Sequence, residues 1–371
     1  MQIKTLTSHD VYNYGASLQA YALMTYLKQQ GHEVAIINYK PEYSTRKYNY
    51  MWVNPESQWH KYRITRIIYC ILKFIQRLSM QKSKQAFDKF TQEHLSLTKE
   101  YITFNELKEN PPTADAYIVG SDQVWNSFYD TGKDPAFYLA FAPEYIKKIS
   151  YSASFSITSI DENIKPFVKE MLQSFDYIAV REHHALEILE DLKLKGTWVL
   201  DPIFLLSIQT WKEIMIPYKK EKSYLLVYDF ENNESIKSFA LQLAKARGLK
   251  IYSINDTYPL LYADKNYSSA GPQEFLTLIY HCDCFISNSF HGSAFSILFH
   301  KDFYIFPRNR HNVNSRMESL LDMFEIKQRL VTQASEYEIA INTPIDFNKT
   351  EVILQKELEI SKHYLQYALQ K

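Results

Sequence analysis

The sequence predicts an α/β fold built from two domains. Short apolar runs of strand length alternate with longer segments of helical periodicity, in two series that lie before and after Pro202. The chain has 371 residues, which is long for a single hydrophobic core, so two domains are the default. We therefore expect one α/β domain over residues 1–201, a second over 202–345, and a final helix within 346–371.

The overall charge and the cysteines narrow the function classes. Lys and Arg together number 42, as do Asp and Glu, so nucleic acid is disfavoured as the main ligand. The three cysteines, Cys70, Cys282 and Cys284, argue against a disulfide framework and fit a reducing compartment. No cluster of metal-ligand residues stands out, so we expect no metal. The N-terminus lacks a signal peptide's apolar core and no stretch has the length of a membrane span, which predicts a cytoplasmic protein.

The chain opens with a βαβ unit. Residues 2–7 and 33–39 are the expected strands, and the helix between them begins near Asn13 and ends near Gln30. Gly15 lies at the strand-to-helix turn, where its missing Cβ allows either a ligand or a packed neighbour to approach closely. The spacing leaves both interpretations open. A GxGxxG dinucleotide fingerprint is missing.

Residues 41–113 do not continue this alternation of strands and helices, and we expect a helical insertion there. Isoleucine and leucine recur at helical spacing from Ile64 to Leu78, and seven Lys or Arg residues occur from Lys61 to Lys84 without one acidic residue. A basic amphipathic helix of this kind can lie on the anionic inner surface of a membrane. The favoured alternative is an ordinary helix that buries its apolar stripe on the domain and exposes a solvated basic face.

Polar residues follow two further expected strands, 114–119 and 149–155. Asp122, Gln123 and Trp125 come after the first, and Ser152 lies at the end of the second. Ligands of open α/β sheets bind at the carboxyl ends of the strands. Asp122 could accept a hydrogen bond from a sugar hydroxyl and Trp125 could stack on its ring. The alternative is a capped turn with a Trp in the core.

Arg181 follows the expected strand 175–180. An Arg at the tip of a strand often clamps a carboxylate or phosphate. The alternative is a surface ion pair with Glu182.

The second series contains a strand–turn–helix junction. Strands are expected at 224–228, 249–254, 283–287 and 303–307, and the residues after the third strand are Ser289, Phe290, His291 and Gly292. A helix that starts there offers backbone N–H groups and the positive end of its dipole to an anion. His291 could contact that anion or transfer a proton to it. The alternative is a helix cap beside a satisfied histidine.

A cationic loop follows the last strand. It contains Arg308, Arg310, Asn314 and Arg316. Cations beside a helix N-terminus favour a phosphate ligand.

Taken in order, six motifs resemble the polysaccharide pyruvyl transferase family and cover nearly the whole chain. Residues 41–113 carry no such motif. The motifs are Asn13-Tyr14-Gly15-Ala16 with Leu18-Gln19-Ala20-Tyr21, Gly120-Ser121-Asp122-Gln123-Val124-Trp125-Asn126, Ser150-Tyr151-Ser152-Ala153-Ser154, Val180-Arg181-Glu182, Asp201-Pro202 and Ser289-Phe290-His291-Gly292.

The resemblance implies two Rossmann-like domains that face each other across a cleft, as in B-type glycosyltransferases. It implies transfer of pyruvate from phosphoenolpyruvate to two hydroxyls of a sugar, with formation of a cyclic ketal and without a cofactor. The acceptor would be a bacterial capsule or exopolysaccharide precursor, free or lipid-linked. The C-terminal helix, 346–371, would pack back toward the first domain.

The resemblance also implies roles for residues. His291 and Arg181 would be catalytic. The donor would contact Ser289, Phe290, Gly292, Arg308, Arg310, Asn314 and Arg316. The acceptor would contact Asn13, Tyr14, Gly15, Asp122, Gln123, Trp125 and Ser152. Several family members carry an Arg where this chain has Ser289, so another cation, Arg316, Arg310 or Arg308, would have to replace it.

Two other functions fit the same fold. One is a B-type glycosyltransferase that uses a nucleotide sugar. Glu182 and Glu190 have a spacing reminiscent of such enzymes, but they lie in the first half of the chain and we interpret them as a solvated helix face. The other is a non-catalytic member of the family that binds glycans.

Overall fold

Two parallel five-stranded sheets form the centre of the protein. The computed structural model describes residues 1–371 except 46–50, 54–56, 256–258, 309–313 and 371. In the first sheet the order is β3-β2-β1-β4-β5, and the strands are β1 (Gln2–Leu6), β2 (Glu33–Tyr39), β3 (Leu97–Tyr101), β4 (Ala116–Val119) and β5 (Lys147–Ser150). In the second the order is β10-β9-β8-β11-β12, and the strands are β8 (Tyr224–Tyr228), β9 (Lys250–Ile254), β10 (Lys265–Tyr267), β11 (Cys284–Ser287) and β12 (Asp302–Ile305).

This architecture confirms the predicted fold class of two Rossmann-like α/β domains. Every residue of β4, β8 and β11 is buried, as expected for strands covered by helices on both faces. A short pair, β6 (Ala179–Val180) and β7 (Thr197–Trp198), lies next to β5. In each sheet the strand order reverses at the centre, between β1 and β4 and between β8 and β11. Ligands of such sheets bind outside these reversal points.

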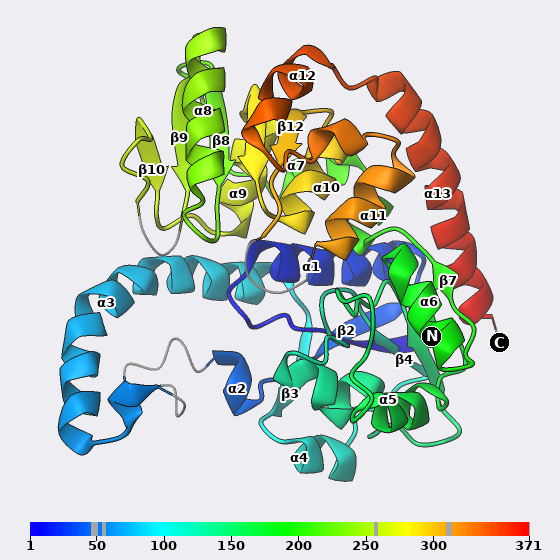
Figure 1. Cartoon of the computed structure of the whole chain (residues 1–371). Helices are drawn as coiled ribbons and strands as arrows, with labels where there is room; N and C mark the ends of the chain where they lie inside the picture. The colour runs from blue at the N-terminus through cyan, green and yellow to red at the C-terminus, as the bar shows by residue number, and fades with distance from the viewer. Residues whose placement is uncertain (46–50, 54–56, 256–258, 309–313, 371) are drawn as a thin grey trace.

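The helices cover the two sheets (Figure 1). In the first domain and its insertion these are α1 (Tyr14–Gln29), α2 (Glu42–Thr45), α3 (Arg63–His94), α4 (Phe104–Glu109), α5 (Lys165–Leu172) and α6 (His183–Asp191). After Pro202 come α7 (Ile208–Glu213), α8 (Glu234–Arg247), α9 (Pro272–His281), α10 (Phe290–Leu298), α11 (Ser315–Met323), α12 (Tyr337–Asn342) and α13 (Phe347–Ala368).

The two domains share a hydrophobic core. One continuous cluster of buried side chains includes residues of β1, α1, α9, α10 and α13. At its centre the ring of Tyr14 stacks on Phe275, with centroids 4.6 Å apart and planes 5° apart. The C-terminal helix contacts the first domain, since the Ser361 hydroxyl of α13 accepts from the Leu200 amide at 2.9 Å. Figure 1 shows α13 running alongside both domains.

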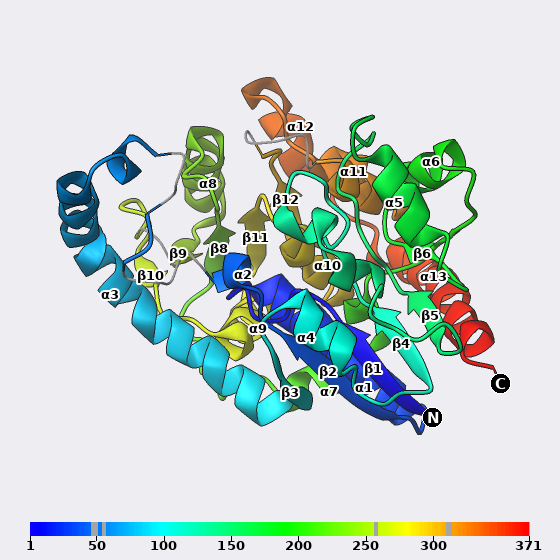
Figure 2. The same ribbon diagram turned by 90° about the horizontal axis from the view of Figure 1, so that it is seen from below.

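The insertion differs from its prediction in two ways. Residues 41–113 are not purely helical, because β3 lies within them and pairs with β2 at the sheet edge. The long helix α3 also buries only part of its apolar residues. Phe87 and Phe90 are buried, whereas Ile64 and Ile71 near its N-terminus are 72% and 66% exposed. Figures 1 and 2 show this first half of α3 projecting away from both sheets. The favoured interpretation of a helix that buries its stripe is therefore wrong for the first half.

Candidate active site

A cavity of about 350 Å³ opens where the centres of the two sheets face each other. Its walls combine the ends of first-domain elements with the start of α10 and the loop before α11. The lining residues are Ser8, Val11, Asn13, Tyr43, Ser44, Asp122, Gln123, Tyr129, Asp130, Thr131, Phe230, Ser289, Phe290, His291, Arg308 and Arg316. Two domains thus contribute to one cavity at their strand reversal points.

The start of α10 forms one wall of the cavity. Ser289 caps this helix, and its Oγ accepts a hydrogen bond from the Gly292 amide at 3.2 Å. A Cβ on Gly292 would lie 2.5 Å from the Phe285 ring, so this glycine lets α10 pack on β11. The predicted donor contact by Gly292 is therefore wrong, because its amide is already bonded. The amides of Phe290 and His291 belong to the first turn and have no partner within the helix.

His291 lies against α1 of the other domain. Its side chain is 7% exposed and lines the cavity. A Cβ built on Gly15 would lie only 2.0 Å from His291 Nδ1. Gly15 is therefore required for the approach of this imidazole. Of the two interpretations of Gly15, the structure supports packing, and the packed neighbour is a predicted site residue.

Asp201 orients the charged side chains of the site. Its fully buried Oδ2 accepts from Ser121 Oγ at 2.7 Å and from Arg181 Nη1 at 3.1 Å. The same oxygen lies 3.4 Å from His291 Nε2. Burial alone would raise the pKa of Asp201, but His291, Arg181 and Ser121 together hold that pKa well below its ordinary value. The carboxylate therefore stays ionised beside the imidazole.

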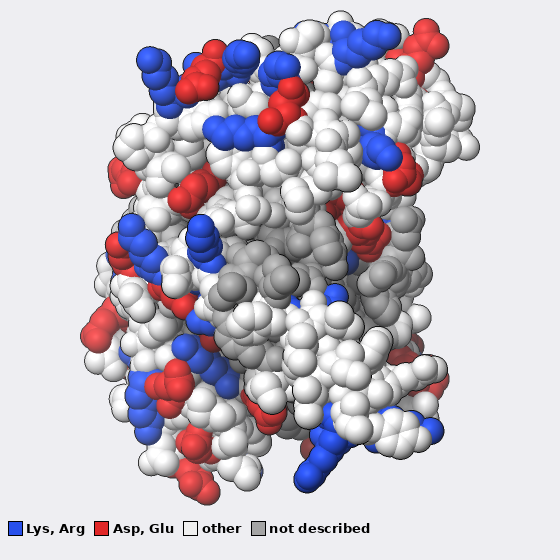
Figure 3. All heavy atoms as spheres, turned by 90° about the vertical axis from the view of Figure 1, so that its left-hand side faces the viewer, with Lys and Arg blue, Asp and Glu red and all other residues white. Residues whose placement is uncertain are grey.

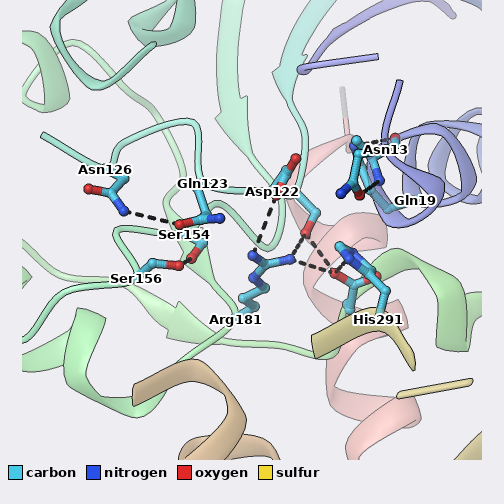
Figure 4. A network of polar contacts seen from close by, with 12 residues as sticks. Asn13, Gln19, Asp122, Gln123, Asn126, Ser154, Ser156, Arg181 and His291 are labelled. Atoms are coloured by element: carbon cyan, nitrogen blue, oxygen red, sulfur yellow. Dashed lines mark hydrogen bonds and ion pairs between the residues drawn. The ribbon is translucent and has the colours of Figure 1, made fainter. Parts of the chain in front are cut away.

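Arg181 extends from the end of β6 into the space between Asp122 and His291 (Figure 4). Its guanidinium is fully buried and lies 4.4 Å from the centre of the Phe290 ring. Nη2 is 3.8 Å from Asp122 Oδ1, which is too far for a hydrogen bond. Among the described residues, neither Nε nor Nη2 has a hydrogen-bond partner. Arg181 does not line the cavity itself, but it carries unused donors next to Asp122 and Phe290, which do.

Glu182 does not form the surface ion pair considered for Arg181. It is fully buried, its Oε2 lies 3.8 Å from Arg181 Nε, and its Oε1 accepts from Ser154 Oγ and from the amides of Phe155 and Ser156. The interpretation of Glu182 as part of a solvated helix face is wrong for the same reason, although Glu190 is exposed.

Arg316 adds a second buried cation. It is 6% exposed, lines the cavity from α11, and lies 5.8 Å from the centre of the Phe290 ring. Burial, reinforced by the nearby charge of Arg181, lowers the pKa of Arg316 to about 10. Its Nε finds no acceptor within the described part of the chain. Two guanidinium groups therefore lie against the Phe290 ring, and both have N–H groups without a partner among the described residues.

The rest of the cationic loop plays a smaller part. Arg308 lines the cavity, and its Nε donates to Glu231 at 3.2 Å. The Asn314 side chain bonds the Arg308 amide at 2.9 Å and its carbonyl at 3.3 Å, so it holds the loop rather than lining the cavity. Arg310 lies outside the described residues.

Comparison with known proteins identifies the family. The family model described as polysaccharide pyruvyl transferase matches residues 13–310. The chain belongs to the polysaccharide pyruvyl transferase family. The protein is thus a member of a transferase family whose activity is pyruvyl transfer to polysaccharide. No curated protein gives a match.

Comparison with solved structures finds similar chains of low sequence identity. Arabidopsis thaliana UGT89C1 complexed with quercetin is 11% identical over 97% of this chain and 94% of its own, with a TM-score of 0.49. The UDP-GlcNAc 2-epimerase from Methanocaldococcus jannaschii is 11% identical over 99% of this chain and 100% of its own, with a TM-score of 0.48.

The first-domain wall of this pyruvyl transferase family member contains three of the predicted acceptor residues. Asn13 caps α1, and its Oδ1 accepts from the Ala16 amide at 3.2 Å. Asp122 lines the cavity from a left-handed backbone position with φ of 82°. Such positions are costly for residues other than glycine and cluster at functional sites. Gln123 lines the cavity beside it and accepts from Asn126 at 3.1 Å.

Three predicted acceptor contacts are wrong because the side chains are buried elsewhere. Trp125 is fully buried, and its Nε1 donates to the Phe137 carbonyl at 3.0 Å. Tyr14 is 2% exposed and packs between the domains. Ser152 is fully buried behind the cavity, with its Oγ 3.5 Å from Ser121 Oγ.

Sequence analysis did not assign roles to Ser121 and Asp201. Both residues lie within the family motifs and near strand ends, so their positions in the sequence could have indicated a role in the site. Their role became visible only when the fold brought them to Arg181 and His291. Tyr43 and Ser44 also line the cavity, although they come from the insertion, where no motif was found.

Proposed function

We propose that this protein transfers pyruvate from phosphoenolpyruvate to two hydroxyls of a sugar in a surface-polysaccharide precursor, forming a cyclic ketal. The observation that carries the proposal is the pair Arg181 and Arg316. Arg316 lines the cavity, Arg181 lies against the lining residue Phe290, and both retain guanidinium N–H groups without a hydrogen-bond partner among the described residues. A buried cation with free donors favours an anion that accepts several hydrogen bonds. Phosphoenolpyruvate carries a phosphate and a carboxylate, one for each guanidinium.

His291 supplies the proton in this proposal. Its Nε2 faces the ionised Asp201, so Asp201 favours a proton on Nε2 and orients the ring. Nδ1, on the side of Gly15, then exchanges the catalytic proton. It protonates the methylene carbon of phosphoenolpyruvate, which becomes a methyl group. The adjacent carbon becomes an oxocarbenium ion, whose charge lies close to the phosphate.

Two additions of sugar oxygen complete the reaction. One hydroxyl attacks the oxocarbenium carbon and gives up its proton. The C–O bond to phosphate then breaks, and the second hydroxyl attacks the same carbon. Of the two hydroxyl protons, one replaces the proton given to the methyl group and the other leaves on hydrogen phosphate, so the atoms and charges balance. Asp122, which lines the cavity, would accept one of these protons.

Ligand-induced thermal shift tests the donor. Phosphoenolpyruvate should raise the melting temperature of the wild type, because it binds only the folded protein, whereas UDP-glucose and GDP-mannose should not. Arg316→Gln should reduce the shift strongly. The matched control is Arg247→Gln, which removes a guanidinium that pairs with Asp302 on the surface of the second domain.

The result also separates the alternatives. A shift with a nucleotide sugar and none with phosphoenolpyruvate would overturn the proposal in favour of a glycosyltransferase. A shift with neither would favour a glycan-binding member.

Turnover tests the role of His291. His291→Ala should fold and still bind phosphoenolpyruvate, but phosphate release in the presence of a sugar acceptor should fall about 10²- to 10⁴-fold, as expected for loss of a general acid. His183→Ala removes a histidine whose side chain is 57% exposed and should retain activity. Full activity of His291→Ala would contradict the mechanism.

A further inference from the structure

The first half of α3 exposes a continuous apolar face. Five large aliphatic side chains within nine residues are each more than 40% exposed: Ile64 (72%), Ile67 (55%), Ile68 (43%), Ile71 (66%) and Leu72 (65%). Their spacing of three and four residues places them on one side of the helix. Trp59 and Tyr62, just before the helix, are 40% and 60% exposed. Single exposed apolar residues are ordinary, but a contiguous patch marks an interaction surface.

The charge around this face has one sign. Lys61, Arg63 and Arg66 are exposed, and no Asp or Glu occurs between Ser57 and Phe87. The chain as a whole has a formal net charge of zero, so the net positive charge of this segment is balanced by an excess of acidic residues elsewhere in the sequence. Figure 3 views the molecule from the side on which α3 projects, where uncharged surface lies among both basic and acidic side chains. On the helix, Arg63 and Arg66 lie beside and opposite the apolar residues.

We propose that the first half of α3 is a docking surface for an anionic lipid bilayer. An amphipathic helix with an aliphatic face and a basic face lies in the membrane interface, with its apolar side chains among the acyl chains and its cations at the phosphates. Trp59 and Tyr62 belong to the two aromatic residue types that are enriched at the membrane–water interface. The helix lies on the membrane and does not cross it, since no helix in the described ranges is long and apolar enough to span one.

Charge argues against a second copy of this chain as the occupant. Pairing the first halves of two such helices would place Arg63 and Arg66 beside their own counterparts, without any acidic residue in that part of α3 to balance them. Anionic headgroups supply the missing charge.

The docking surface follows, in the sequence, an element that lines the candidate active site. Tyr43 and Ser44 of α2 line the cavity, and α2 immediately precedes the segment that leads to α3. An enzyme docked through α3 would hold the cavity near the membrane. A sugar acceptor attached to a lipid would then reach it without leaving the bilayer.

Vesicle flotation tests the proposal. The wild type should float with phosphatidylcholine vesicles that contain phosphatidylglycerol. Its affinity for pure phosphatidylcholine vesicles should be lower by about tenfold or more. Raised salt should weaken the binding. The triple variant Ile67→Gln/Ile71→Gln/Leu72→Gln and the double variant Arg63→Gln/Arg66→Gln should each lose about tenfold or more of the affinity.

Matched controls use equally exposed residues elsewhere. Leu261→Gln/Ile339→Gln/Val352→Gln changes aliphatic side chains that are 97%, 66% and 72% exposed, and Lys195→Gln/Lys245→Gln changes exposed cations. Both controls should bind vesicles as the wild type does. All variants should keep the wild-type response to phosphoenolpyruvate, so a failure of docking is distinguishable from a failure of the proposed function.

Three results would overturn the proposal. The wild type could fail to float, or the α3 variants could float as well as the controls. Alternatively, sedimentation equilibrium without lipid could show a dimer that the triple variant dissociates, which would assign the apolar face to a second copy.

Discussion

Asp201 is the residue on which the polar site depends. It contacts one side chain from each of three segments, Ser121, Arg181 and His291. Its ionised form therefore fixes the direction of the His291 ring and balances part of the buried positive charge. We assign Asp201 as a positioning residue that acts through His291.

Asp201→Asn should keep the shape of the site but change its chemistry. The amide can donate to His291 Nε2, which favours the wrong tautomer, so we expect kcat to fall by roughly 10²- to 10⁴-fold. The KM for phosphoenolpyruvate should change less, because Arg316 is untouched. The pH–rate profile of the variant should differ from that of the wild type. A variant with an unchanged pH profile and only a lower melting temperature would show a merely structural role.

The same substitution should alter stability in a pH-dependent way. The pKa of Asp201 is lower in the folded protein than its ordinary value of 3.8, so the carboxylate stabilises the fold above that pH. This contribution is lost as the pH falls through the lowered pKa. Urea unfolding should therefore show a large stability difference between wild type and Asp201→Asn at neutral pH and a smaller one in strong acid. An equal difference at both pH values would contradict the assignment.

At the scale of elements, the site depends on the close approach of α1 and α10. Gly15 on α1 leaves the space that the His291 imidazole occupies. The side chain of Tyr14, one residue earlier, is anchored in the other domain by Phe275 and by a hydrogen bond to the Ala270 carbonyl at 3.1 Å. The two helices therefore have little freedom to separate.

Gly15→Ala should disturb the site through a steric clash with His291. Its Cβ would fall 2.0 Å from Nδ1, so either the imidazole or α1 must move. We expect activity to fall at least about tenfold and the protein to lose roughly 1–3 kcal/mol of stability, as for an overpacked core.

A double-mutant cycle identifies the cause. In a His291→Ala background the clash is absent, so Gly15→Ala should then cost little or no stability. An equal loss of stability in both backgrounds would show that the glycine serves α1 itself and not His291.

The sequence predicted those elements whose apolar runs are continuous. The strand Tyr224–Tyr228 was predicted with its observed bounds. The edge strand β3 was missed because only Tyr101 of its five residues is buried, so no apolar pattern marks it. The exposed face of α3 was misjudged because periodicity shows which residues share a helix face but not whether that face has a partner.

The residue types of the site could be predicted from the sequence, but the burial of each side chain could not. His291, Arg181 and Arg316 line or adjoin one cavity, as their positions after strands and before helices suggested. Trp125 could not be separated from a sugar-stacking residue, because burial depends on the packing of distant segments such as Phe137. Contacts between the two halves of the chain, such as that of Asp201 with His291, have no local signal.

At the scale of the whole molecule, the shared core makes the two domains depend on each other. The cluster of buried side chains that fills the domain interface is the same one that supports both sheets. Helix α13 adds a second link, since the Tyr364 hydroxyl donates to the Ser150 carbonyl at 2.8 Å. Separate domains would unfold separately, but domains with a common core should unfold together.

Calorimetry should accordingly show one unfolding transition for the wild type, and Tyr14→Ala should lower its temperature. The substitution removes the stacked ring between the domains and should cost about 3–5 kcal/mol, as for other large core aromatic side chains. Tyr145→Ala is the matched control, because this tyrosine is 86% exposed and its loss should change stability by less than about 0.5 kcal/mol. Two separate transitions in the wild type would contradict the shared core. A Tyr14→Ala variant as stable as Tyr145→Ala would show that the interface is held elsewhere, through α13.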